Sequence, residues 1–232
     1  MIPNMRDLGG ICTKDGRRIR QGTLIRSGQL SQAEESDLVG VSAIIDLRTS
    51  EEQREAPDRT HGRQYLPLPI FEGAIPGVSH EQNSESSALP DMPAVYRQTA
   101  IECAESFGRV LRSVMEHDFS RGAILWHCTE GKDRCGITTA LILEALGIEW
   151  NDILEDYLKT NETNIPKAEA VRAQLTPVYG AAFSESVYRA YIADEKYLLA
   201  AWEGMGTNYI TGKLCIPEET LNAFRQTVLE GV

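Results

Sequence analysis

Residues 122–136, GAILWHCTEGKDRCG, constrain the fold of this chain more than any other stretch. They begin with a short apolar run typical of a buried strand, Ala123–Trp126, and from Arg134 onward the apolar residues recur with helical spacing. A strand that passes through a loop into a helix binds anions, because the first N–H groups of the helix lack intrahelical partners and the positive end of its dipole faces the loop. The pattern therefore predicts an α/β fold with an anion site at this junction.

Cys128 stands in this loop as the candidate nucleophile, because the positive end of the helix stabilises a thiolate. Arg134 adds a planar fork of donors that matches two phosphate oxygens. Gly131 can take the positive φ angle that lets the loop amides converge on one point. With Gly136 after the arginine, the stretch resembles the phosphate loop of cysteine-dependent phosphatases. The alternative is a buried cysteine at a strand end, since a bare Cys-x5-Arg also occurs by chance.

Composition narrows the class of protein. The chain has 232 residues, 42% of them apolar and 25% charged, which suits one soluble globular domain over residues 1–232. A formal net charge of −11 leaves no basic footprint for a nucleic acid and weakens docking to anionic membranes. We expect no membrane insertion and, without a signal-peptide pattern, a cytoplasmic location, although another export route stays open.

The five cysteines are an odd number, widely spaced and without a Cys-x2-Cys pair. This spacing argues against a disulfide scaffold and against a structural zinc site. We therefore expect neither a metal nor another cofactor.

The remaining pattern predicts strands in the first half of the chain and mostly helices in the second. Strands are predicted at 11–13 and 17–20 around an Asp15–Gly16 hairpin turn, and at 23–26, 41–47 and 65–70, the last at a sheet edge because of its prolines. Helices are predicted at 31–39, 51–55, 93–117, 134–147, 148–161, 166–175, 184–202 and from 217. Residues 72–93, rich in Gly, Ser, Asn and Pro, predict a mobile loop or lid.

Asp46 and Arg48 follow the predicted strand at 41–47. Ligands of open α/β sheets bind beyond the carboxyl ends of the strands, so these side chains can come near Cys128. Equally, they can pair with each other or cap the helix that follows.

Five motifs occur in one order: residues 4–10 (NMRDLGG), 25–28 (IRSG), 46–48 (DLR), 127–134 (HCTEGKDR) and 156–161 (DYLKTN). In this the chain resembles the atypical bacterial tyrosine and lipid phosphatases over nearly its whole length. The resemblance implies the cysteine-phosphatase fold, a mostly parallel sheet flanked by helices. It also implies phosphotyrosine as the substrate, with phosphoserine, phosphothreonine or a phosphoinositide as further substrates.

The mechanism that we expect has two steps and needs no metal. Backbone amides of the loop, Thr129 to Arg134, and the Arg134 guanidinium hold the phosphate while Cys128 attacks phosphorus, and water then hydrolyses the phosphocysteine. An acid must protonate the leaving oxygen. Asp133 matches the loop aspartate of the family and is the first candidate, with a helix-start charge as the alternative; Asp46 is the second candidate.

Two loop positions depart from the family pattern. Cys135 stands where the family usually has Thr or Ser, and a thiol is a weaker donor to the nucleophile, so we expect slow breakdown of the intermediate or a reversible disulfide with Cys128. Glu130 stands where a small residue is usual. Its charge opposes phosphate binding unless it turns away to hold Arg134 or another cation.

Three further side chains have expected roles. Lys132 matches the lysine of the family loop and implies a second phosphate cation, with a solvated charge at the rim as the alternative. His127 is expected to orient the loop by hydrogen bonding. Arg6 and Asp7 are expected to form a structural ion pair rather than a catalytic one.

Two other functions stay open. One is a non-catalytic module that binds phosphoproteins, against which the presence of both Cys128 and Arg134 argues. The other is a redox or sulfur-transfer enzyme, because such enzymes also use cysteine anion loops. The partner that we expect is a phosphorylated protein or a phosphoinositide, and the sequence carries no prediction of the oligomeric state.

Overall fold

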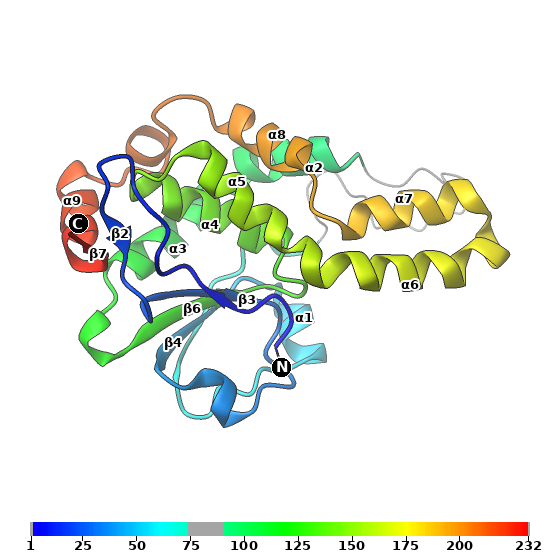
Figure 1. The fold of residues 1–232 in the computed structure, drawn as a ribbon, viewed down its shortest axis with the longest axis horizontal. Coiled ribbons are helices and arrows are strands. Elements are labelled where there is room, and N and C mark those ends of the chain that lie inside the picture. The colour runs from blue at the N-terminus through cyan, green and yellow to red at the C-terminus, as the bar shows by residue number, and fades with distance from the viewer. Residues whose placement is uncertain (1, 74–90, 232) are drawn as a thin grey trace.

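A five-stranded sheet forms the centre of the computed structural model, which describes residues 2–73 and 91–231 (Figure 1). Its order is β1 (Arg6–Asp7), β3 (Leu24–Ser27), β6 (Ala123–His127), β4 (Val41–Asp46) and β5 (Gln64–Pro67). Strands β3, β6, β4 and β5 run parallel, and β1 is antiparallel at one edge. The predicted mostly parallel sheet is confirmed, with β5 at the edge as expected.

The central strand β6 is buried along its whole length, which explains why it reads as a continuous apolar run. Its side chains alternate between two cores. Trp126 faces the larger one, beneath α3 (Ala104–Met115) and α4 (Asp133–Ala145). Leu125 faces a smaller one with Leu30 and Leu38, beside the 3-10 helix Glu35–Leu38. Figure 1 shows α3 and α4 together on one face of the sheet.

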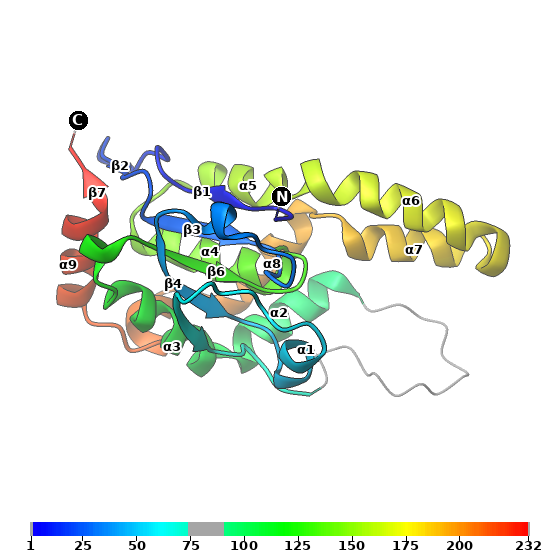
Figure 2. The same ribbon diagram turned by 90° about the horizontal axis from the view of Figure 1, so that it is seen from below.

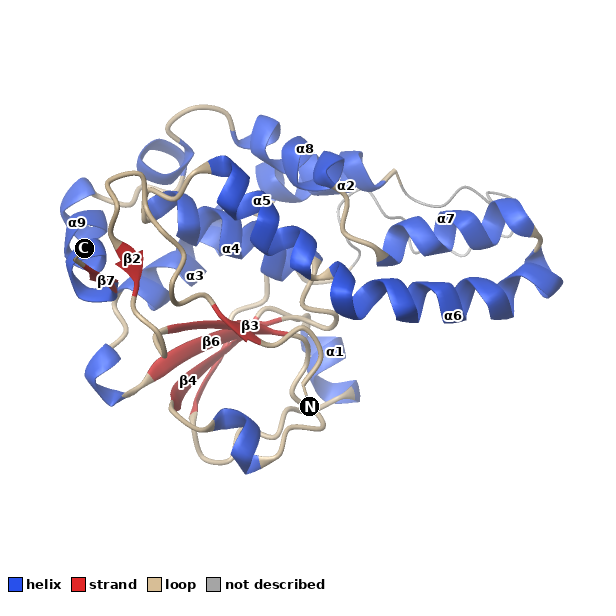
Figure 3. Ribbon diagram, in the orientation of Figure 1, coloured by secondary structure: helices blue, strands red, loops and turns tan. Residues whose placement is uncertain are grey.

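Figure 3 shows the helical character of the second half of the chain, which confirms that prediction. α5 (Trp150–Lys159) follows α4, and α8 (Glu195–Met205) packs against α2 (Met92–Glu102). The remaining elements are α1 (Ser50–Glu55), the 3-10 helix Phe119–Arg121, the π-helix Tyr209–Lys213, α9 (Glu218–Val228) and the pair β2 (Arg18–Ile19) and β7 (Leu229–Glu230). Within 2–73 and 91–231, no helix is long and apolar enough to cross a membrane.

Two helices, α6 (Asn161–Tyr179) and α7 (Ala181–Tyr191), pack side by side and project from the body as an arm (Figures 1 and 2). The sequence predicted a break at Thr176–Pro177, but Pro177 lies inside the last turn of α6. The chain reverses instead at Gly180, whose φ of 82° and ψ of 167° suit glycine and few other residues.

Three other local predictions differ from the structure, and one lies mostly outside the described residues. The helix predicted at 93–117 is two helices, because Cys103 leaves the helical conformation (φ −96°, ψ 19°). The helix predicted from Ser31 begins after Glu34, which forms the capping box with Asp37. The turn at Asp15–Gly16 is present, but only Gly16 has a positive φ, so it is not type I′. Most of the predicted mobile loop, residues 74–90, lies outside the described residues.

Candidate active site

The parallel strands all end at one edge of the sheet, and the Cys128 loop lies there. Ser27 of β3 and Asp46 of β4 are both in register with His127, the last residue of β6. The loop therefore starts between the ends of two neighbouring strands. This confirms that the segment after Asp46 reaches the same edge as Cys128.

Gly131 gives the loop its curl, with a φ of +68° as predicted. A Cβ atom at this position would lie 2.7 Å from the Ser27 carbonyl oxygen and 2.8 Å from the Gly28 nitrogen. The Gly131 carbonyl accepts hydrogen bonds from Asn4 Nδ2 (2.8 Å) and Arg26 Nη2 (2.7 Å). Only glycine fits here, and two side chains far away in the sequence fix its carbonyl.

Asp156 of α5 holds two arginine side chains in place, and one of them is Arg26, which anchors the Gly131 carbonyl. Its carboxylate accepts from Arg6 Nε at 2.7 Å and from Arg26 Nη1 at 2.6 Å. Burial raises the pKa of Asp156, but the charges of Arg26 and Arg6 outweigh it and lower the pKa below its usual value. The motifs at 4–10, 25–28 and 156–161 therefore meet behind the loop that follows Cys128.

Arg6 and Asp7 do not form the ion pair that the sequence predicted. Arg6 pairs with Asp156, whereas the Asp7 carboxylate accepts from the backbone nitrogens of Gly9 (2.9 Å) and Gly22 (2.6 Å). Both roles are structural, as expected.

Cys128, the first residue after β6, is 2% exposed. A hydrogen bond from the Cys135 thiol, the charge of Arg134 and the Cys135 backbone N–H lower the pKa of Cys128 to about 6, against the effect of burial. At neutral pH the thiolate is then the major form.

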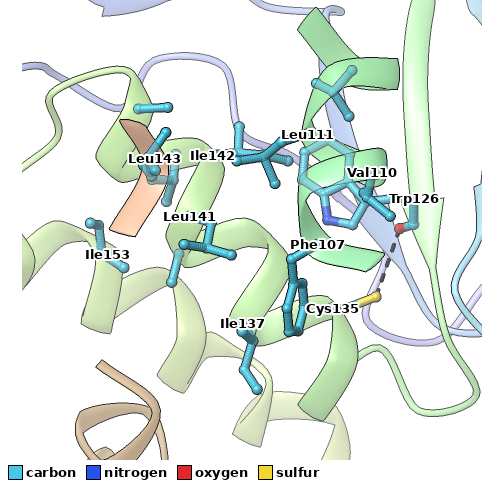
Figure 4. Close-up of a cluster of buried hydrophobic side chains, with 14 of the residues drawn as sticks. Phe107, Val110, Leu111, Trp126, Cys135, Ile137, Leu141, Ile142, Leu143 and Ile153 are labelled. Atoms are coloured by element: carbon cyan, nitrogen blue, oxygen red, sulfur yellow. Dashed lines mark hydrogen bonds between the residues drawn. The ribbon is translucent and has the colours of Figure 1, made fainter. Parts of the chain in front are cut away.

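Cys135 occupies the first turn of α4 with its side chain in the core (Figure 4). Its Sγ lies 3.5 Å from the Ser27 carbonyl oxygen and 3.9 Å from that of Trp126. Burial, with the neighbouring Cys128, raises the pKa of Cys135 well above the usual value. Cys135 therefore stays a thiol, and its proton can turn from these carbonyls to the Cys128 thiolate.

Glu52 of α1 holds Arg134 in a two-pronged ion pair that the sequence analysis missed. Arg134 Nη1 and Nη2 lie 2.5 and 2.7 Å from the two carboxylate oxygens, and Thr129 Oγ1 donates to the same group. Burial raises the pKa of Glu52, but the hydrogen bonds and the charge of Arg134 outweigh burial and lower this pKa to about 2. The available signal was the capping box Thr49-x-x-Glu52, which places that carboxylate at the start of α1.

Lys132 occupies neither of the two positions that the sequence predicted, beside the phosphate or solvated at the rim of the loop. The side chain is 1% exposed, so it is not a solvated charge at the rim. Its ammonium contacts the carbonyl oxygens of Ala190 and Ile192 at the end of α7 (3.3 Å to Ile192), where a helix attracts cations. The structure therefore does not support a second phosphate cation at this position.

Asp133, the first candidate for the acid, is the first residue of α4, and its side chain is 41% exposed. Its Oδ1 accepts from Tyr96 Oη at 2.6 Å and lies 3.2 Å from Lys132 Nζ. Tyr96 Oη also forms a hydrogen bond with Tyr157 Oη at 2.7 Å. No signal in the sequence marked the buried Tyr96 as a neighbour of this carboxylate.

Asp46, the second candidate for the acid, is fully buried and paired with Arg48 at 2.7 Å. Burial raises the pKa of Asp46, but the Arg48 hydrogen bonds and the nearby His127 ring hold it at about 2. A carboxylate that stays ionised and buried has no proton to give to a substrate, so the structure argues against Asp46 as the acid.

Asp58 completes this buried network, which the sequence analysis also missed. It lies 2.9 Å from Arg48 Nη2 and 3.0 Å from His127 Nε2. A metal could bind where one side-chain oxygen or nitrogen each from Asp46, Asp58 and His127 lie within 4.8 Å of one another. The Arg48 guanidinium, however, already pairs with both carboxylates and supplies the positive charge. His127 Nδ1 forms a hydrogen bond with the Cys128 carbonyl (3.3 Å), so His127 orients the loop as expected.

Glu130 turns away from the loop, one of the two outcomes that the sequence analysis allowed. Its carboxylate oxygens lie 2.5 and 2.7 Å from Nζ of Lys167 on α6, not on Arg134.

The sequence of this chain is similar to those of known proteins. A model of a tyrosine phosphatase family matches residues 1–230. A Cupriavidus necator protein whose name places it among the tyrosine-protein phosphatases is 33% identical over 174 residues, 70% of this chain and 62% of that protein's length. The triple specificity protein phosphatase PtpB of Mycobacterium tuberculosis is 27% identical over 258 aligned positions, 98% of this chain and 86% of that protein. The solved structure of P. aeruginosa TpbA aligns over 80% of this chain and 90% of that one at 14% identity, with a TM-score of 0.38, too loosely to compare residues.

Proposed function

This chain belongs to the tyrosine phosphatase family, and we propose that it is a cysteine-dependent phosphatase that hydrolyses phosphotyrosine. One observation carries the proposal: Cys128, with its pKa lowered to about 6, shares a loop with Arg134, whose Nε has no hydrogen-bond partner within residues 2–73 and 91–231. Nη1 and Nη2 of Arg134 donate to Glu52, and Nη2 also lies 3.3 Å from Thr129 Oγ1, so Nε is the donor that we propose for a phosphate oxygen.

The first step transfers the phosphoryl group to sulfur. The Cys128 thiolate attacks phosphorus, the bond from phosphorus to the leaving oxygen breaks, and Asp133 gives its proton to that oxygen. Loop amides and Arg134 bind the three remaining oxygens, whose charge they match. The exposed position of Asp133 at the start of α4 suits contact with a leaving group at the mouth of the loop.

The second step restores the enzyme. Water attacks the phosphocysteine, Asp133 accepts a proton from that water, and Cys128 leaves as a thiolate. The Cys135 thiol stabilises the departing sulfur by hydrogen bonding, as it stabilises the free thiolate. We propose no metal or cofactor in either step.

We propose a substrate range wider than phosphotyrosine, with phosphoserine, phosphothreonine and phosphoinositides as candidates. The name of the PtpB relative, a triple specificity protein phosphatase, supports more than one class of substrate. The burial of Lys132 argues against the second phosphate cation that the family resemblance implied.

The test is phosphate release from peptides that carry each phosphorylated residue and from phosphoinositides, in EDTA, for the wild type and Cys128→Ser. We expect release by the wild type that the substitution abolishes. Release that survives the substitution would contradict the cysteine mechanism. A folded wild type that binds phosphate but releases none would favour the phosphate-binding module.

A further inference from the structure

Glu130 places a negative charge inside the loop that must bind a phosphate dianion. It lies between Thr129 and Gly131, so its backbone belongs to the phosphate cradle, while its side chain is 34% exposed. A carboxylate a few ångströms from a bound phosphate repels it, and it also competes for the guanidinium of Arg134. A site that binds phosphate therefore needs the Glu130 carboxylate to point away from the phosphate and to be paired with a cation.

Lys167, in α6 of the arm, balances it. Its Nζ contacts both oxygens of Glu130, at 2.5 and 2.7 Å. The same ammonium lies 5.5 Å from the centre of the Tyr191 ring on α7, within the range of a cation–π contact. Both helices of the arm thus hold the ammonium against the loop, although Lys167 is 37 residues from Glu130 in the sequence.

We propose that Lys167 is a positioning residue for phosphate binding, which acts by holding the Glu130 carboxylate away from the phosphate. The inference rests on the proposed function for its kinetic consequence, but phosphate binding tests it directly. Without Lys167, the Glu130 carboxylate is free to face the incoming phosphate. Affinity for phosphate then falls, while the chemical step on bound substrate, which uses Cys128 and Asp133, is affected less.

A double-mutant cycle tests this coupling with Lys167→Met, Glu130→Gln and the double variant. We expect Lys167→Met to raise KM for p-nitrophenyl phosphate roughly fivefold, the upper range for an exposed ion pair, with kcat changed much less. Glu130→Gln lowers KM, and the double variant has the KM of Glu130→Gln. Lys167→Arg keeps the charge and restores binding.

Arg172→Met is the matched control, because Arg172 lies on the same helix but pairs with Glu185 and stacks on Tyr188 of α7. It should leave KM unchanged. If Lys167 is merely structural, Lys167→Met lowers kcat or thermal stability, and Glu130→Gln does not rescue it. That outcome, or an unchanged KM in Lys167→Met, overturns the proposal.

Calorimetry with inorganic phosphate separates this proposal from the proposed function. The same substitutions are made in the Cys128→Ser background, and the Kd of phosphate should follow the same cycle. A wild type that releases no phosphate from any substrate would refute the proposed function, while the phosphate Kd values would still decide the role of Lys167.

Discussion

Glu52 binds the two terminal nitrogens of the Arg134 guanidinium at 2.5 and 2.7 Å, and within the described part of the chain Arg134 Nε donates no hydrogen bond. A guanidinium has two edges that can each bind a pair of oxygens, so one carboxylate can fix its plane without occupying the edge that a phosphate needs. The ring of Phe71, 5.3 Å from the guanidinium carbon, limits its movement further. The arginine is thus oriented before the substrate arrives.

Glu52→Gln should lower kcat/KM roughly tenfold to a hundredfold, because misplacement of a positioning group by about 1 Å has effects of this size. The amide keeps one acceptor oxygen and loses the charge that holds the guanidinium. Steady-state kinetics on a phosphotyrosine peptide measure the loss. Glu51→Gln, an exposed neighbour on α1, is the control, and equal kcat/KM for the wild type and Glu52→Gln would contradict the role.

The pH dependence should follow Cys128. Its pKa is lowered to about 6, so the thiolate is present above that pH and is lost as the pH falls below it. Alkylation of Cys128 by iodoacetamide, followed by mass spectrometry, should therefore have a midpoint near pH 6. A midpoint near that of free cysteine, about 8.5, would show that the loop does not activate the thiol.

Substitutions at Cys135 should separate its two effects on the nucleophile. Cys135→Ala removes the thiol donor, so the alkylation midpoint of Cys128 should rise and hydrolysis of the phosphoenzyme should slow about tenfold, the lower end for the loss of a hydrogen bond to a charged group. Cys135→Ser supplies a stronger donor and should speed that hydrolysis. Rapid-quench burst kinetics resolve the two steps. If both variants hydrolyse the intermediate at the wild-type rate, Cys135 has no part in its breakdown.

Asp156→Asn should lower the free energy of unfolding by about 3 kcal/mol, because it leaves the buried guanidinium of Arg26 and the partly buried one of Arg6 without a counter-charge. The pKa of Asp156 is lowered in the fold, so its stabilising contribution is present above the pKa of an unfolded carboxyl and is lost as the pH falls. Urea unfolding at pH 7 and at lower pH should show a gap between wild type and variant that narrows in acid. Glu155→Gln, an exposed change on the same helix, should have little effect.

Gly131→Ala should abolish most of the activity, since the added Cβ meets the Ser27 carbonyl oxygen and the Gly28 nitrogen at under 3 Å. Gly147→Ala is the matched control: its φ is also positive, at 79°, but a Cβ there has nothing within 4 Å. Both should lose about 1 kcal/mol of stability from backbone strain. Only the first should lose phosphate affinity by calorimetry, and equal activity of the two variants would contradict the clash.

The sequence predicted the geometry of the Cys128 loop well because that geometry is local. Gly131 and the start of α4 lie within a few residues of Cys128, so their spacing carries the curl of the loop and the position of the helix. The parallel strands were also predictable from continuous apolar runs such as β6. Breaks within helices were harder, because the bend at Cys103 involves no glycine or proline.

The partners of the loop side chains could not be predicted, because they come from distant segments. Glu52 and Lys167 meet Arg134 and Glu130 across 82 and 37 residues. Lys132 matched a family lysine, but its orientation depends on where the arm places the end of α7. A motif fixes which residues are present, while these long-range contacts decide which way each side chain points.

The anchoring of Gly131 bears on when, during folding, the site comes into existence. Asn4 reaches its carbonyl across 127 residues, and Arg6 reaches Asp156 across 150. Contacts between such distant segments form late, because long stretches of chain must close first. During synthesis, a growing chain that still lacks α5 would carry Cys128 without the shaped loop. The reactive thiolate should thus appear only after α5, which ends at Lys159 of the 232 residues, has left the ribosome.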